Sequence, residues 1–155
     1  MAQVPPQDFS MQLLPLGTCA ANRTSHQDYS SYLLKFRNKT TQFQILLDCG
    51  SKRVLNFDEV DPKHLKMIIL SHSHLDHTHY IGKLIKKLVS YRRVAPLTII
   101  AHPNTIEVIK KMIKLWNQRK IPEFVRFTPI KLTIHDPYLR DRKSTRLNSS
   151  HGKLS

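Results

Sequence analysis

The chain has 155 residues, 40% of them hydrophobic, and its formal net charge at pH 7 is +14. That length and apolar fraction predict one globular domain with a real core, and no apolar run is long enough for a membrane-spanning helix. So basic a charge favours a polyanionic partner, although a lysine-rich, solvated helix face would explain it equally well.

The start of the chain and its cysteines bear on location. Residues 1–10 are proline-rich and expected to be loose, and they lack the basic start and apolar core of a secretory signal. The two cysteines, Cys19 and Cys49, follow no C-x-x-C spacing, which favours reduced thiols. An intracellular, cytoplasmic protein is therefore expected, with the nucleus or an organelle left open.

Strands are predicted first, over residues 11–16, 31–36 and 42–47, the last two as an antiparallel pair. The third strand ends at Asp48, just before Cys49 and Gly50. Taken alone, Asp48 is typical of a turn. Beside a metal site it would instead support a metal ligand. Residues 58–65 then carry a weak short-helix signal.

The most informative stretch is residues 71–79, directly after an apolar strand at 67–70. It holds four of the nine histidines together with one carboxylate: His72, His74, Asp76, His77 and His79. Neutral imidazoles and a carboxylate suit zinc, and α/β folds place their sites at the carboxyl ends of strands. The spacing lets His72 and His74 turn toward one cation, and Asp76 and His77 toward a second. Two adjacent cations would suit a bridging hydroxide; a solvated, histidine-rich loop is the alternative.

Two amphipathic helices, with a strand at 97–101 between them, are predicted after this stretch. The inward positions of the first are Ile81, Leu84, Ile85, Leu88 and Val89. Those of the second, over 105–120, are Ile106, Ile109, Met112, Ile113 and Trp116. The basic side of the first helix favours solvated surface over phosphate contact. Short strands follow at 124–127 and 132–134; His102 is interpreted as a helix-capping residue, and neither it nor His135 is assigned as a ligand.

The segment from His72 to His77 resembles the HxHxDH motif of the metallo-β-lactamase superfamily. The resemblance implies that His72 and His74 bind one zinc ion and that Asp76 and His77 bind a second, with manganese or another divalent metal as the alternative. It also implies that Asp48 supports the histidine loop and that Asp76 is the candidate catalytic residue. His79 departs from the family pattern and is expected at the rim of the site.

Residues 11–140 resemble the N-terminal half of a metallo-β-lactamase αββα sandwich, an α/β (α+β) fold with a mixed sheet flanked by helices. Within the superfamily, residues 14–18, Arg23 and residues 30–34 and 45–50 resemble the ribonuclease Z branch of tRNA 3′-processing endonucleases. The resemblance implies zinc-dependent hydrolysis of phosphodiester bonds in precursor tRNA, with homodimerisation left open.

The end of the chain breaks the pattern. Residues 141–155 lack periodicity and match the translation of a common sequencing-library adapter, so a non-native tail is expected after a partial domain ending at residue 140. An ordinary polar tail is the alternative. The family's later metal ligands and tRNA-gripping arm have no counterpart that the sequence places, so the chain alone is expected to bind metal weakly and to be inactive.

Two other functions are compatible with these residues. The first is a small-molecule hydrolase of the same fold, acting on cyclic nucleotides or other phosphodiesters. The second, from a different class, is a non-catalytic fragment or binding domain with a partial metal site.

Overall fold

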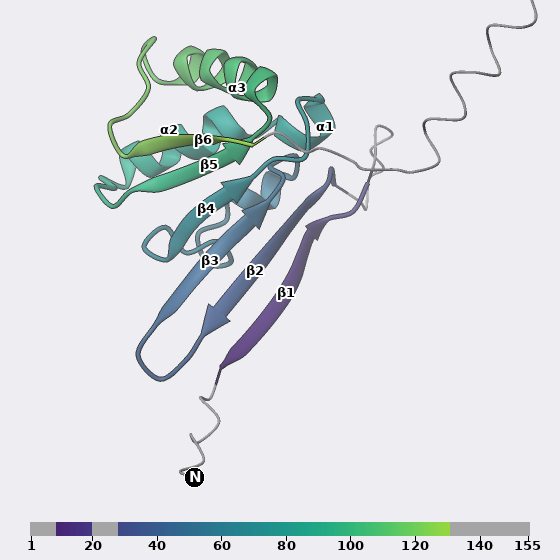
Figure 1. The fold of residues 1–155 in the computed structure, drawn as a ribbon, viewed down its shortest axis with the longest axis vertical. Helices are drawn as coiled ribbons and strands as arrows, with labels where there is room; N and C mark the ends of the chain where they lie inside the picture. Colours follow the sequence, from purple (N-terminus) through teal and green to yellow (C-terminus); the bar gives the residue numbers. More distant parts are fainter. Residues whose placement is uncertain (1–8, 20–27, 131–155) are drawn as a thin grey trace, which may run out of the picture.

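The computed structural model describes residues 9–19 and 28–130. In this part of the chain, six strands form one sheet in chain order (Figure 1). They are β1 (Ser10–Gly17), β2 (Ser31–Arg37), β3 (Gln42–Leu47), β4 (Leu65–Ile69), β5 (Leu97–Ala101) and β6 (Val125–Pro129). β1, β2 and β3 pair antiparallel, and β3 to β6 pair parallel. The predicted mixed sheet is confirmed.

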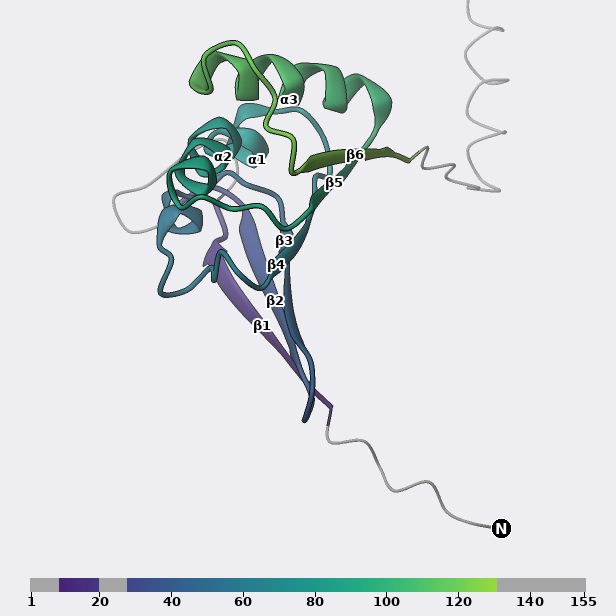
Figure 2. The ribbon, with the colours of Figure 1, turned by 90° about the vertical axis from the view of Figure 1, so that its left-hand side faces the viewer.

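The helices lie in the connections between the parallel strands. They are the 3₁₀ helix η1 (Lys52–Leu55) and the α-helices α1 (Leu75–Thr78), α2 (Ile81–Ser90) and α3 (Pro103–Trp116). Crossovers between parallel strands are right-handed, and here the strand order advances in one direction from β3 to β6. Successive crossovers therefore fall on the same face of the sheet, and Figure 2 shows α2 and α3 on one side of it.

The core lies between that face and the helices. Leu33, Leu46, Ile68 and Ile99 are register partners across β2 to β5, and each is fully buried. The helices add four residues from α2 and three from α3: Ile81, Leu84, Ile85, Leu88, Ile106, Ile109 and Ile113. Burying each such side chain stabilises the fold by about 1.5–3 kcal/mol relative to leaving it exposed.

The helix predicted over residues 58–65 is absent, and that prediction was wrong. The range consists of turns, and its last residue already belongs to β4. Side-chain oxygens explain the difference: Asn56 accepts from the backbone N–H of Asp58 at 3.1 Å, and Asp61 accepts from that of Lys63 at 2.8 Å. Such local bonds compete with helix formation.

The second long helix begins and ends earlier than predicted. His102 is its N-cap and accepts from the backbone N–H of Asn104 at 3.3 Å, which confirms the capping interpretation. The helix stops at Trp116 because the Asn117 side chain donates to the carbonyl of Ile113 at 3.0 Å. The next two residues adopt left-handed φ values of 50° and 63°, which end the helix.

Two residues predicted to point inward are largely exposed. Val89 is 43% exposed and Trp116 is 38% exposed. Val89 lies at the edge of the apolar stripe of α2, one position beyond Leu88. The indole of Trp116 packs instead against Gly82 at the junction of the two helices, where a Cβ on the glycine would lie 2.3 Å from Trp116 Cδ1.

Several predictions fall outside the described residues. These are the loose segment over 1–8, the strand at 132–134, His135, the domain end at 140 and the tail over 141–155. Ser10, predicted to be loose, is the first residue of β1 and pairs with Arg37. Among the helices that the structure describes, none combines the length and apolar character needed to cross a membrane.

Candidate metal centre

The histidine-rich stretch begins where β4 ends, at the carboxyl edge of the parallel strands. Neighbouring β3 ends there too, and the backbone N–H of Asp48 donates to the carbonyl of Ile69 at 2.9 Å. The predicted loop contains the single-turn helix α1, with Asp76 in its first turn. A carboxylate is favoured at that position by the free amides of the helix start.

Asp48 connects both ends of the stretch. One of its oxygens accepts from the backbone N–H of Ser71 at 2.8 Å, and its Oδ2 lies 2.7 Å from Nδ1 of His77. The Ser71 hydroxyl donates to the same carboxylate at 2.9 Å. Asp48 is largely buried and adopts a left-handed φ of 57°, a conformation that Asp tolerates better than most residues.

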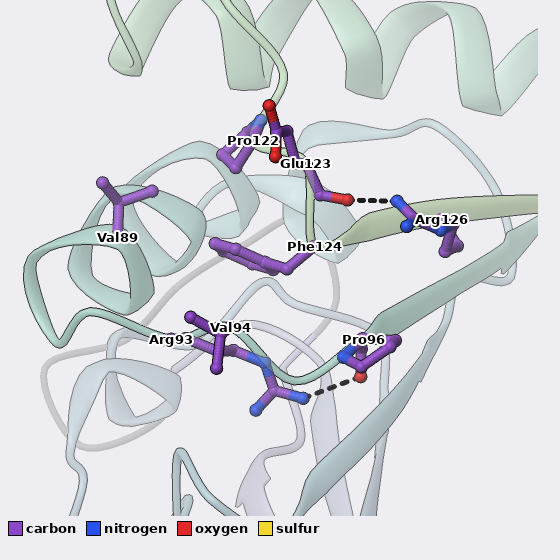
Figure 3. A pocket seen from close by; sticks show the side chains of 8 residues that line it. All are labelled: Val89, Arg93, Val94, Pro96, Pro122, Glu123, Phe124 and Arg126. Atoms are coloured by element: carbon purple, nitrogen blue, oxygen red, sulfur yellow. Dashed lines mark hydrogen bonds between the residues drawn. The ribbon is translucent and has the colours of Figure 1, made fainter.

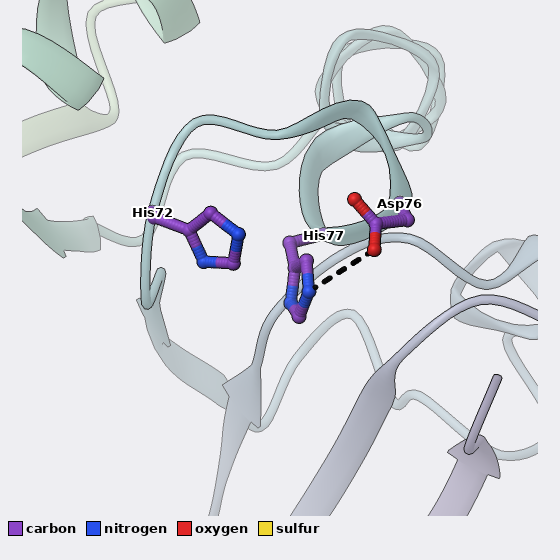
Figure 4. Close-up of side chains that lie close together, drawn as sticks. All are labelled: His72, Asp76 and His77. Carbon is purple, nitrogen blue, oxygen red and sulfur yellow. Dashed lines mark ion pairs between the residues drawn. The ribbon is translucent and has the colours of Figure 1, made fainter. Parts of the chain in front are cut away.

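The contact with Asp48 fixes the tautomer of His77. A carboxylate only accepts, so in the neutral imidazole the hydrogen lies on Nδ1, at the shorter of its two carboxylate contacts, and the lone pair lies on Nε2. That Nε2 lies 3.3 Å from Oδ2 of Asp76 (Figure 4). A histidine held by a carboxylate through one nitrogen presents the other to a metal in an ordered direction.

His72 completes a group of three side chains that could hold a metal ion. One donor atom from each of His72, Asp76 and His77 lies within 4.8 Å of the other two, and all three residues are half-buried. Figure 4 shows the rings of His72 and His77 and the carboxylate of Asp76 gathered at one place. Two imidazole nitrogens and a carboxylate oxygen are a donor set that zinc accepts, so these residues fit a divalent cation.

Ser71 orients His72 much as Asp48 orients His77. Its hydroxyl lies 2.9 Å from Nδ1 of His72 and has already given its only hydrogen to Asp48. The hydroxyl therefore accepts from Nδ1 of His72, which leaves the lone pair on Nε2. Burial, followed by the neighbouring His77 and His74, lowers the pKa of His72 below its usual range. A neutral imidazole is the form that binds metal.

His74 is placed beside this group, not within it. It is exposed, is the N-cap of α1 without a side-chain capping bond, and has its ring centroid 4.5 Å from that of His72. His79 is the C-cap of α1, and its ring lies 4.7 Å from that of Tyr80 and 6.2 Å from that of Tyr29. Its Nδ1 is buried and has no hydrogen-bond partner among the described residues.

The segment after Asp48 holds α1 in place, a role that the sequence did not reveal. The backbone N–H of Cys49 donates to the carbonyl of His77 at 2.7 Å, and that of Tyr80 donates to the carbonyl of Cys49 at 2.9 Å. A Cβ on Gly50 would lie 1.8 Å from the carbonyl oxygen of Asp76, so this close approach requires glycine. In the sequence, the only signal for this role is a glycine placed directly after a strand.

Two further buried side chains act around the same segment. Ser31 accepts from the backbone N–H groups of Gly50 and Ser51, each at 2.9 Å. Complete burial, with a smaller effect of Asp48, raises the pKa of the Cys49 thiol far above its usual range. Cys49 is thus a neutral, fully buried core residue.

A separate hollow of about 450 Å³ lies at the amino ends of β5 and β6, away from the metal loop (Figure 3). The guanidinium of Arg93, which lines it, is buried and donates to the carbonyls of Leu65 at 2.7 Å and Pro96 at 2.9 Å, and also to that of Pro62. Burial lowers the pKa of Arg93. Because backbone carbonyls occupy its donors, this arginine is a structural group.

Comparisons with known proteins agree on one superfamily. The family model described as anti-Pycsar protein Apyc1 matches residues 11–120. The ribonuclease Z of Methanococcus aeolicus is 28% identical over 107 residues, which are 68% of this chain and 32% of that protein. The ribonuclease Z of Bradyrhizobium sp. (strain ORS 278) is 30% identical over 124 residues, 76% of this chain and 40% of that protein. The chain thus spans about a third to two fifths of these curated relatives.

A solved structure gives the same result for the fold. The metallo-β-lactamase fold protein YhfI from Bacillus subtilis superposes with a TM-score of 0.57 at 25% sequence identity. The match covers 80% of this chain and 49% of that one. The α/β fold with a mixed sheet predicted from the sequence is therefore that of an experimentally observed structure.

Proposed function

Because the chain belongs to the anti-Pycsar protein Apyc1 family and, with its ribonuclease Z relatives, to the metallo-β-lactamase superfamily, we propose that it carries the metal-binding loop of a phosphodiester hydrolase. The ribonuclease Z and metallo-β-lactamase matches indicate a family of metal-dependent nucleases and hydrolases. The finer proposal is a ribonuclease Z-like endonuclease acting on precursor tRNA.

One observation carries this proposal: the 2.7 Å contact between Asp48 and His77, with His72 and Asp76 in the same group. A solvated histidine-rich loop would not need a buried carboxylate, in a left-handed conformation, to orient one of its rings. The arrangement supports a built metal site.

His72, Asp76 and His77 would hold the first cation, and His74 is the nearest further imidazole. A bound zinc or other divalent ion would supply Lewis-acid chemistry and lower the pKa of a coordinated water toward neutrality. The chain's own contribution is orientation: Asp48 and Ser71 keep both Nδ1 atoms engaged and both Nε2 lone pairs available. The arrangement of two zinc ions, one on His72 and His74 and one on Asp76 and His77, remains a prediction.

Activity on a nucleic acid or small diester is a proposal for the whole protein, since the chain spans about a third to two fifths of the length of these relatives. Cleavage of precursor tRNA that is abolished by chelation would support the nuclease. Cleavage of only a small chromogenic diester would support the small-molecule phosphodiesterase instead. For the 155-residue chain we expect metal binding without turnover, and detectable hydrolysis would contradict that expectation.

The metal site itself is tested by zinc titration of the 155-residue chain. His72→Ala should lower the bound zinc at a fixed free concentration by at least about tenfold, because one donor of the group is lost. His64→Ala is the matched control, since His64 pairs with Asp61 at the amino end of β4. Unchanged zinc content in His72→Ala would refute the metal site.

A further inference from the structure

A line of ring contacts leads from the metal loop to the helices. The ring of His79, at the end of α1, lies 4.7 Å from that of Tyr80. Nζ of Lys83, on the first turn of α2, lies 5.3 Å from the centroid of the Tyr80 ring. Through the buried ring of Tyr80, the end of α1 is therefore in contact with Lys83 at the start of α2.

The line continues onto α3 through an exposed indole. Nζ of Lys83 lies 5.0 Å from the Trp116 ring centroid, and that of Lys86 lies 5.7 Å from it. Trp116 is 38% exposed, and Gly82 lets it approach α2 closely. A large aromatic ring with two lysines beside it thus lies on the outside of the α2–α3 junction.

The surroundings of this junction are poor in carboxylates. Residues 77–122 contain ten Lys and Arg but one carboxylate, Glu107. Glu107 pairs with Lys110 at 2.8 Å. In the described ranges neither Lys83 nor Lys86 forms an ion pair, so both ammonium groups retain their positive potential.

We propose that Lys83, Lys86 and Trp116, called here the helical strip, bind a single-stranded RNA segment that extends from the metal centre; the ring of Tyr80, beside Lys83, is buried and belongs to the core. Lysines neutralise backbone phosphates, and exposed aromatic rings stack on bases, which is the combination that single-strand-binding surfaces use. The inference rests on the proposed function, since a phosphodiesterase centre makes a nucleic acid the polyanion to expect beside it. It deepens that function, because it names the surface that would hold the strand on either side of the cleaved bond.

The strip is tested by fluorescence anisotropy with a labelled single-stranded RNA of about 12 nucleotides, with chelator present so that cleavage is absent. The 155-residue chain is compared with the double variant Lys83→Gln/Lys86→Gln. The matched control is Lys63→Gln/Lys66→Gln, which removes the same charge from two exposed lysines at the amino end of β4. The control matters because a chain this basic binds RNA partly through net charge alone.

Salt dependence separates phosphate contact from a structural effect. For single strands the slope of log affinity against log salt should fall by about 0.7 for each lysine that contacts a phosphate. The slope should therefore decrease in the strip variant and stay at the wild-type value in the control variant. Trp116→Ala should weaken binding by about tenfold, and Trp116→Phe should restore much of it, since phenylalanine keeps a stacking face.

If the strip variant and the control variant lost equal RNA affinity, or if the salt slope of the strip variant were that of the wild type, the proposed RNA-binding strip would be refuted. A small diester or cyclic mononucleotide that competes fully with the RNA for the strip would overturn it as well. Zinc titration of the strip variant separates this failure from failure of the proposed function: zinc binding should be unchanged, because no ligand of the metal group is altered. Loss of zinc binding in His72→Ala with intact RNA binding would support two independent sites.

Discussion

Oδ2 of Asp48 lies 2.7 Å from Nδ1 of His77, although the two residues are 29 positions apart in the chain. The contact joins the end of β3 to the helix that follows β4. It exists because β3 and β4 are parallel neighbours whose carboxyl ends meet at one edge of the sheet. The parallel pairing of β3 and β4 therefore determines how the Asp48 carboxylate orients the His77 ring in the candidate metal centre.

Asp48→Asn should lower zinc affinity by about 10–100-fold, the usual cost of removing a carboxylate that orients a histidine ligand. Asn has a similar shape and tolerates positive φ, so the fold should persist. Isothermal titration with zinc measures the loss, and circular dichroism checks the fold. Wild-type affinity in a folded Asp48→Asn protein would show that this carboxylate does not tune the site.

Gly50→Ala should destabilise the protein by at least about 1–3 kcal/mol, the cost of overpacking a close contact. The added methyl group would lie 1.8 Å from the carbonyl oxygen of Asp76, so α1 must move away from β3. Urea denaturation measures the change. Ser90→Ala, at the exposed end of α2, is the control and should alter stability by under about 0.5 kcal/mol. Equal midpoints for the two variants would contradict the close approach.

Leu46→Ala should cost about 2–5 kcal/mol, because it opens a cavity in the fully buried row that crosses β2 to β5. Leu13→Ala, on β1, removes the same atoms from a side chain that is 55% exposed and should cost far less. Chemical denaturation of both variants provides the comparison. A larger loss from Leu13→Ala would mean that the core lies elsewhere.

Glu59 should make stability depend on pH below neutrality. Hydrogen bonds from Arg53, the nearer at 2.5 Å, hold the pKa of Glu59 below its ordinary value of 4.5. A carboxyl with a lowered folded-state pKa stabilises the fold above its unfolded value, and that stability is lost as the pH falls through the folded value. Melting temperatures of wild type and Glu59→Gln should therefore differ at pH 7 and converge in acid. A gap that stays constant with pH would contradict this.

The fold could be predicted where one physical signal dominated. Short strand-like runs located β1 to β3, and the HxHxDH spacing identified the superfamily. The failures share a cause. Residues 58–65 lost their helix to side chains that bond nearby backbone, and Trp116 was drawn to the α2–α3 junction by the space above Gly82. The spacing of hydrophobic residues along the chain shows neither the side-chain hydrogen bonds to the backbone nor the packing against Gly82.

The metal ligands named from the sequence stay a prediction, and the structure adds how their side chains are grouped. The residues named from the sequence all lie at one edge of the sheet, yet the closest group is His72, Asp76 and His77, with His74 beside it. The sequence spacing paired residues that are close along the chain, namely His72 with His74 and Asp76 with His77. The positions of the side chains depend on how α1 is held against β3, through Cys49 and Gly50, and one sequence does not show that contact.

The backbone bonds of Cys49 also tie the histidine-rich loop to the sheet. A four-residue helix such as α1 is far too short to persist alone in water. Here its carbonyl at His77 and the N–H of Tyr80 just beyond it are tied to Cys49, next to a strand in the interior of the sheet. Amide hydrogens of Cys49 and Tyr80 should consequently exchange with solvent water as slowly as those of β3 itself. A metal ion held by this loop would then be released only by an opening that breaks the bonds between α1 and Cys49, so its residence time would depend on that contact with the sheet.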